Sequence, residues 1–158
     1  MGLTVAGDSG KFSVASAVGE GLLVIRQLDQ LVGIAGGDRD TYLRYSLGPE
    51  ADARQTSRDY ESGLELPGLS VVPLAPPGWW RRPVADWLAR QVCKYAQLGE
   101  GDADRCAWIL TGRVVGRGPD HEPLVADPKP LAILSDSVVD QARSHYHEHF
   151  EVGRDSQS

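Results

Sequence analysis

The sequence predicts an α+β fold, a single domain in which a mixed or largely antiparallel sheet is flanked by two or three helices. Two observations favour this class. Short runs rich in aromatic and β-branched residues are typical of strands, whereas longer segments with apolar residues three or four apart are typical of amphipathic helices. These elements follow one another without the regular strand–helix–strand repetition that builds a parallel sheet. The chain has 158 residues, the usual length of one domain.

The first half of the chain is expected to form three strands and one helix. Strands are predicted at 22–25, 42–46 and 70–74, because these runs are apolar or rich in aromatic and β-branched residues. A helix is predicted at 27–35, where leucine and alanine recur at helical spacing, and Gly36 is expected to terminate it.

The 47–68 segment shows neither helical nor strand periodicity. It contains turn-forming pairs such as Gly48-Pro49 and many charged residues. An irregular stretch of this length is uncommon inside a compact domain. An aromatic residue and spaced leucines, Tyr60, Leu64, Leu66 and Leu69, indicate that the segment packs against the domain, and we therefore expect a functional loop.

The second half is expected to hold two helices and three strands. The helices are predicted at 83–98 and 137–150, and the strands at 107–115, 124–125 and 131–134. Ser135 or Asp136 is expected to cap the closing helix, because both side chains can accept a hydrogen bond from its first turn.

Composition predicts the bounds of the domain and the cellular location of the protein. Residues 1–21, rich in glycine and serine, are expected to be a flexible lead, 22–152 the domain and 153–158 a frayed tail. The first residues lack a convincing signal-peptide core. Cys93 and Cys106 are too few for a disulfide framework, so reduced thiols and a cytoplasmic location are expected.

Charge and hydropathy narrow the class of partner. The formal net charge is −6, which disfavours binding to a phosphate backbone. No run approaches the roughly 20 apolar residues that span a bilayer. The expected partner is a small molecule or another protein, with neither nucleic acid nor membrane involved.

Two candidate sites combine charge with constrained backbone. Strand alternation places Arg44 on the same face as Ser46, where its planar fork of donors suits a carboxylate or phosphate. Alternatively Arg44 pairs with a nearby acid, Asp52 or Asp59.

The second candidate site is the Gly-Pro loop around His121, in which Asp120 and Glu122 share a face if the loop is extended. Paired carboxylates suit acid–base work or the stabilisation of a cationic transition state, although a polar surface hairpin has the same composition.

A pair of tryptophans and a pair of histidines are two further candidate sites. Trp79 and Trp80 cannot both point the same way, so one is expected in the core, while the other lines a pocket or stacks on a ring; Trp80 is the candidate for cofactor contact. Together with the 47–68 segment, this pair could instead form the surface of a non-catalytic protein-interaction or ligand-sensing module. His145 and His149 lie one helical turn apart, as in zinc sites, but the sequence offers no clear further ligand, so no metal is expected.

Four strings resemble an actinobacterial family of small domains with no assigned activity. They span most of the chain between Leu22 and Phe150. The strings are RYSLGPEAD at 44–52, RDYESG at 58–63, LPGLSV at 66–71 and GRGPDHEPLV at 116–125.

A more distant likeness concerns the order Arg44, Ser70, Glu122, which resembles the Arg–Ser–Glu order of ADP-ribosyltransferases. The resemblance implies NAD as cofactor. Arg44 would hold the NAD phosphates and ribose, Ser70 would shape the nicotinamide pocket, and Glu122 would bind the ribose 2′-hydroxyl and stabilise an oxocarbenium-like transition state. Two departures stand out: Val71 follows Ser70 where the family has Ser-Thr-Ser, and Asp120 stands where protein-modifying members carry Glu or Gln.

Overall fold

The computed structural model describes residues 22–98 and 105–151. The predicted lead, 1–21, and the tail, 153–158, lie outside the described residues. In chain order the described elements are β2 (Leu23–Ile25), α2 (Leu28–Ala35), β3 (Tyr42–Ser46), α3 (Pro49–Asp52), β4 (Leu69–Ser70), β5 (Val72–Pro73), α4 (Val84–Leu98), β6 (Cys106–Arg117), β7 (Pro123–Leu134), α5 (Asp136–Tyr146) and the π-helical turn η1 (His147–Glu151).

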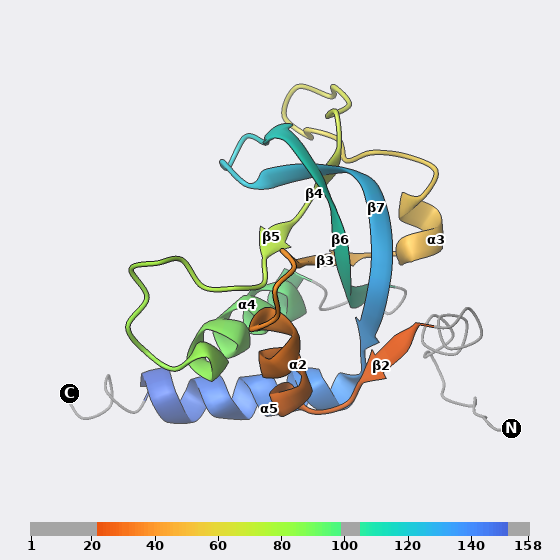
Figure 1. Cartoon of the computed structure of the whole chain (residues 1–158). Coiled ribbons are helices and arrows are strands. Elements are labelled where there is room, and N and C mark those ends of the chain that lie inside the picture. Colours follow the sequence, from red (N-terminus) through yellow and green to blue (C-terminus); the bar gives the residue numbers. More distant parts are fainter. Residues whose placement is uncertain (1–21, 99–104, 152–158) are drawn as a thin grey trace, which may run out of the picture.

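The six strands form one sheet, and the predicted α+β class is confirmed. The order is β2-β7-β6-β3-β5, and β4 pairs with β7 off this path. The edge strand β2 runs parallel to β7, whereas the other pairs are antiparallel. Figure 1 shows α2, α4 and α5 gathered at one end of the sheet, with the 47–68 segment and the β6–β7 hairpin projecting away from α5.

The β6–β7 hairpin is longer than the sequence predicted. The separate strands expected at 124–125 and 131–134 are one strand, β7, in which Asp127 takes a positive φ of 53°. In the sequence, Asp127 and the prolines beside it indicate the end of a strand. In the structure they lie within β7, where the register of its pairing with β6 shifts. Such bulges bend a hairpin, so one end pairs with β3 and the other with β4.

The strand expected at 70–74 is divided at Val71 into two short strands. Its first part, β4, pairs with β7, and its second part, β5, pairs with β3. The prediction of a single strand was therefore wrong, because the chain changes partner strands at this point. The change leaves Ser70 beside the start of β7, where the register aligns Ser70 with Leu124.

Apolar side chains pack into two clusters on opposite faces of the sheet. Leu43 belongs to the cluster covered by the helices, whereas its neighbour Tyr42 joins a second cluster with Trp108 and Val125. This division follows from the alternation of side chains along a strand. No helix among the described residues is both long and apolar enough to cross a membrane.

Candidate functional site

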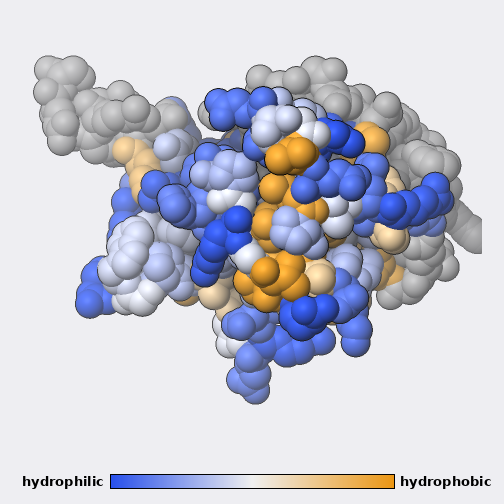
Figure 2. All heavy atoms as spheres, turned by 90° about the horizontal axis from the view of Figure 1, so that it is seen from above, coloured by the Kyte–Doolittle hydropathy of each residue, from blue (hydrophilic) through white to orange (hydrophobic). Residues whose placement is uncertain are grey.

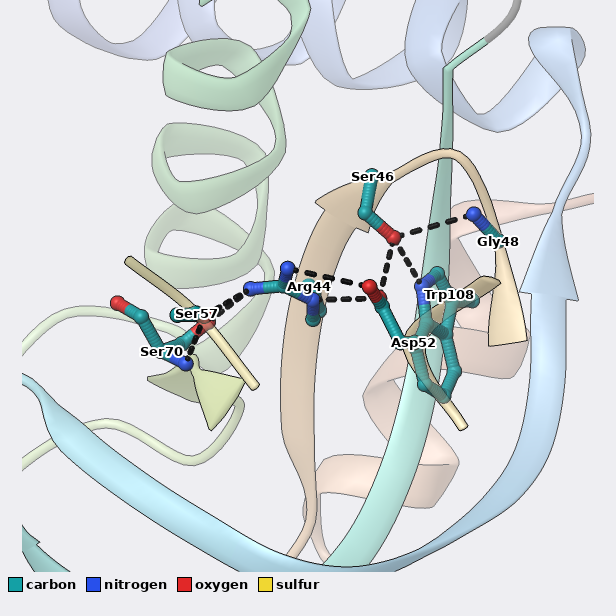
Figure 3. Close-up of polar contacts among 7 residues, drawn as sticks. All are labelled: Arg44, Ser46, Gly48, Asp52, Ser57, Ser70 and Trp108. Atoms are coloured by element: carbon teal, nitrogen blue, oxygen red, sulfur yellow. Dashed lines mark hydrogen bonds and ion pairs between the residues drawn. The ribbon is translucent and has the colours of Figure 1, made fainter. Parts of the chain in front are cut away.

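Arg44 lies on β3 and is paired with a carboxylate, as one of the two sequence interpretations predicted. Its Nε donates to Asp52 Oδ2 at 2.6 Å and its Nη2 donates to Asp52 Oδ1 at 3.3 Å (Figure 3). Asp59 is not this partner; its carboxylate accepts hydrogen bonds from the Ser62 hydroxyl and the Glu61 N–H. The two-pronged contact fixes α3, which carries Asp52, against β3.

Asp52 is 6% exposed and belongs to a larger buried network. The Ser46 hydroxyl donates to Asp52 Oδ2 at 2.5 Å and accepts from the Gly48 N–H at 3.1 Å and from Trp108 Nε1 at 3.0 Å. Gly48 has a φ of +122°, which favours glycine and turns the chain into α3. The network anchors the start of the 47–68 segment on the sheet (Figure 3).

Arg44 also reaches the middle of the 47–68 segment and β4. Its Nη1 donates to Ser57 Oγ at 3.1 Å and to the Ser70 carbonyl at 2.8 Å, while Ser57 Oγ accepts from the Ser70 N–H at 2.8 Å. Of the five guanidinium hydrogens, four are therefore donated within the protein. Its charge is offset by Asp52, so Arg44 acts as a positioning residue for the segment.

Beyond α3, the 47–68 segment is irregular but internally bonded. The Leu66 N–H donates to the Ser57 carbonyl at 2.8 Å, and the Asp59 N–H donates to the Leu64 carbonyl at 2.9 Å. Arg58 and Glu65 form a single antiparallel bridge. These bonds fold the segment back on itself.

Ser70 and Glu122 meet at the pairing of β4 with β7. The Ser70 hydroxyl donates to Glu122 Oε2 at 2.7 Å, and the Asp120 N–H donates to Glu122 Oε1 at 2.9 Å. The turn before β7 is closed by the Gly118 N–H, which donates to the Glu122 carbonyl at 2.8 Å. The Glu122 carboxylate is thus held in place from two sides, whereas the Asp120 side chain is exposed.

Glu122 is ionised at neutral pH. Partial burial raises the pKa of this carboxyl, but the Ser70 hydroxyl, the backbone N–H groups of Glu122 and Asp120, and the neighbouring His121 ring lower it. The lowering influences prevail, so the pKa lies below the ordinary glutamate value. The result is a fixed negative charge with lone pairs left over for a further partner.

Gly118 leaves the space that the Glu122 carboxylate occupies. A Cβ at position 118 would clash with Glu122 Oε2. We expect Gly118→Ala to displace the carboxylate, break its bond to Ser70 and raise the Glu122 pKa toward the ordinary value. An NMR titration of the Glu122 carboxyl carbon measures this change. Gly78→Ala, where a Cβ meets no atom within 4 Å, is the matched control; an unchanged Glu122 pKa in Gly118→Ala would contradict the packing.

Arg44, Ser70 and Glu122 line one cleft of about 680 Å³, together with the 47–68 segment and Asp120. Acidic side chains outnumber basic ones along it: Asp52, Asp59, Glu61, Glu65, Asp120 and Glu122 against Arg44, Arg58 and Arg105. The aromatic residues Tyr45 and Tyr60 also contribute to the lining. The excess of carboxylates gives the cleft a negative potential, which attracts cations.

The outer face of this end of the molecule is mixed. Figure 2, seen from above, shows a band of apolar residues bordered by strongly hydrophilic ones. The 47–68 segment and the β6–β7 hairpin expose several large apolar side chains: Leu47, Leu64, Val114 and Val115.

The tryptophan pair lies elsewhere. Trp80 packs its ring edge-on against Trp87, with centroids 5.2 Å apart, and its Nε1 donates to the Pro83 carbonyl at 3.1 Å. Trp79 is 68% exposed. Neither residue is among those that line the cleft, so the structure does not bring Trp80 together with the other predicted cofactor-binding residues.

Comparison with known proteins gives a family but no activity. No curated protein and no solved structure matches the chain significantly. A family model does match, over residues 18–157, which include every residue of the cleft. The chain therefore belongs to the family of unknown function DUF6098.

Proposed function

We propose that this domain binds a small, positively charged, hydroxyl-bearing molecule in the cleft, with Glu122 as the principal contact. One observation carries the proposal: the ionised Glu122 carboxylate is held inside a cleft by the Ser70 hydroxyl and the Asp120 N–H. A carboxylate accepts up to about four hydrogen bonds. The remaining acceptor capacity, after the bonds from Ser70 and from the backbone N–H groups of Asp120 and Glu122, suits an ammonium or hydroxyl group of a ligand.

The rest of the lining supports a cation. Six acidic residues face three basic ones, and the charge of Arg44 is already offset by Asp52. Tyr60, which is 87% exposed at the cleft, offers a ring face to a positive group. We also propose a cytoplasmic location for the protein, because its two cysteines are too few for a disulfide framework.

Calorimetric titration with glucose and two charged derivatives of the same ring shape tests the charge preference. We expect glucosamine, a cation, to bind more tightly than neutral glucose, and anionic glucuronate to bind least. Glu122→Gln keeps the shape of the side chain and removes its charge, so we expect glucosamine affinity to fall by at least about tenfold, the equivalent of a lost hydrogen bond to a charged group.

Glu50→Gln is the matched control, because Glu50 is exposed on α3 and is not among the cleft-lining residues. It should bind glucosamine as the wild type does. Equal affinity for glucosamine and glucuronate in the wild type, or an unchanged affinity in Glu122→Gln, would count against the proposal.

A second candidate function is cleavage of NAD. It is favoured by one observation, the 2.7 Å hydrogen bond from Ser70 to Glu122 in the cleft that Arg44 also lines, which fits the Arg–Ser–Glu order of ADP-ribosyltransferases. Nicotinamide would leave with the electrons of its bond to ribose C1′, and the Glu122 carboxylate would stabilise the resulting oxocarbenium charge. Water would then add to C1′ and lose its proton. Asp120 would help Glu122 bind the ribose, while Arg44, paired with Asp52, would add little attraction for the phosphates.

Release of free nicotinamide from NAD tests this candidate. We expect the wild type to release nicotinamide and Glu122→Gln to be slower by roughly 10²–10³-fold, the usual effect of removing an electrostatic stabiliser. If the wild type releases none above the rate in buffer, cleavage is excluded and binding alone remains.

A further inference from the structure

Three side chains of types that can bind a metal meet where α4 packs against α5: two histidines four residues apart and an aspartate from a distant part of the sequence. Asp86 lies in the first turn of α4 and is 2% exposed, whereas His145 lies on α5 and His149 on η1. One ligand atom of each residue lies within 4.8 Å of the other two. We propose that Asp86, His145 and His149 form a zinc site, separate from the cleft. The sequence indicated the two histidines as candidate ligands but not Asp86.

His149 is already in the tautomer that a metal needs. Its Nδ1 lies 2.9 Å from the His145 carbonyl, and because a carbonyl only accepts, Nδ1 must carry the proton. The Nε2 lone pair is then left for a ligand. Such a bond from the second ring nitrogen to a carbonyl is the usual means of orienting a zinc-binding histidine.

His145 shares its proton with Asp86. Its Nε2 donates to Asp86 Oδ1 at 2.7 Å, which brings a ring nitrogen and a carboxylate oxygen, both zinc-ligand atoms, next to each other. Zinc would take the place of this proton, which would leave to solvent. The His145 and His149 rings stack with their centroids 3.9 Å apart. Because each nitrogen lone pair lies in its own ring plane, the exposed His149 ring turns out of this stack when it binds zinc.

Arg82 links the Asp86 carboxylate to the π-helical turn η1. Its Nε donates to Asp86 Oδ2 at 3.0 Å, and its Nη2 donates to the His149 carbonyl at 2.8 Å. The first bond occupies the carboxylate oxygen that does not face His145. The guanidinium charge also opposes a cation, so the site should be weaker than one with an unpaired aspartate.

The ligand set selects zinc over the common hard cations. Two imidazole nitrogens and one carboxylate oxygen suit zinc, whereas calcium and magnesium prefer oxygen ligands alone. Zinc bonds of about 2.1 Å separate neighbouring tetrahedral ligands by roughly 3.4 Å. The ligand atoms lie within 4.8 Å of one another, and a movement of the exposed His149 side chain can bring them to this shorter separation. Water would take the fourth position.

Titration of the untagged full chain with zinc chloride, followed by calorimetry, tests the proposal. We expect one zinc ion per chain and no heat with magnesium chloride. Cobalt(II) chloride should give the visible absorption of a tetrahedral complex. In His149→Ala, which alters an exposed side chain and should fold normally, we expect zinc affinity to fall at least tenfold and the cobalt absorption to disappear.

His147→Ala is the matched control, because His147 is on the same turn but outside the three-residue cluster. It should bind zinc like the wild type. Asp86→Asn keeps the size of the side chain and should weaken zinc binding as His149→Ala does. Absence of zinc binding by the wild type, or equal affinity in His149→Ala, overturns the proposal. Glu122→Gln should still bind zinc, so this result is independent of the cleft.

Discussion

Asp52→Ala is expected to lower the free energy of unfolding by about 3 kcal/mol or more. The substitution removes the partner of Arg44, whose side chain is only 16% exposed. Breaking a buried ion pair from one side leaves an uncompensated charge, which typically costs about 3–5 kcal/mol. It also takes the acceptor from the Ser46 hydroxyl, which bonds to Asp52 Oδ2.

Urea denaturation followed by far-ultraviolet circular dichroism measures this loss. Glu50→Ala is the control: Glu50 lies two residues earlier on α3 and is exposed, so its replacement should change stability by no more than about 0.5 kcal/mol. If Asp52→Ala were no less stable than Glu50→Ala, the network in Figure 3 would not anchor the 47–68 segment.

Trp108→Ala is expected to cost about 3–5 kcal/mol, the range for removing a large buried aromatic side chain. Trp108 is 1% exposed and belongs to the cluster on the face away from the helices. Its Nε1 also donates to Ser46 Oγ at 3.0 Å. The substitution therefore removes packing and one hydrogen bond together.

Trp108→Phe separates the two contributions. It keeps an aromatic ring in the core and removes the indole N–H, so we expect a smaller loss, about 1–3 kcal/mol including the lost bond to Ser46 and the reduced volume. Urea denaturation compares both variants with the wild type. If Trp108→Phe lost as much stability as Trp108→Ala, ring packing would not be the main contribution of this residue.

The elements with clear periodicity were predicted from the sequence. The strand 42–46 is β3 with the same bounds, and the helix predicted at 83–98 is α4, Val84–Leu98. The strand with few signals was harder. β7 contains Asp127, which takes a positive φ and lies beside prolines, and those residues usually end strands; here they sit at a bulge in a long hairpin.

Some of the residues that line the cleft carry a signal in the sequence. Strand alternation and the Gly-Pro loop drew attention to Arg44 and Glu122, and the structure places both residues at one cleft. Ser57, which joins Arg44 to Ser70, had no signal, because a serine in an irregular segment has no periodicity to mark it. Asp86 was missed for another reason: it meets His145 across 59 residues of sequence, and only tertiary packing brings them together.

Binding at Glu122 can be observed at the carboxylate itself. In protein labelled with carbon-13 at glutamate, glucosamine should shift the Glu122 carboxyl signal in a saturable manner, with the Kd found by calorimetry. The Asp120 amide, which donates to Glu122 Oε1, should shift with it, and the Glu50 carboxyl signal should stay in place. If glucosamine saturates the protein while the Glu122 carboxyl signal does not move, the ligand binds elsewhere and Glu122 is not the centre of the cleft's function.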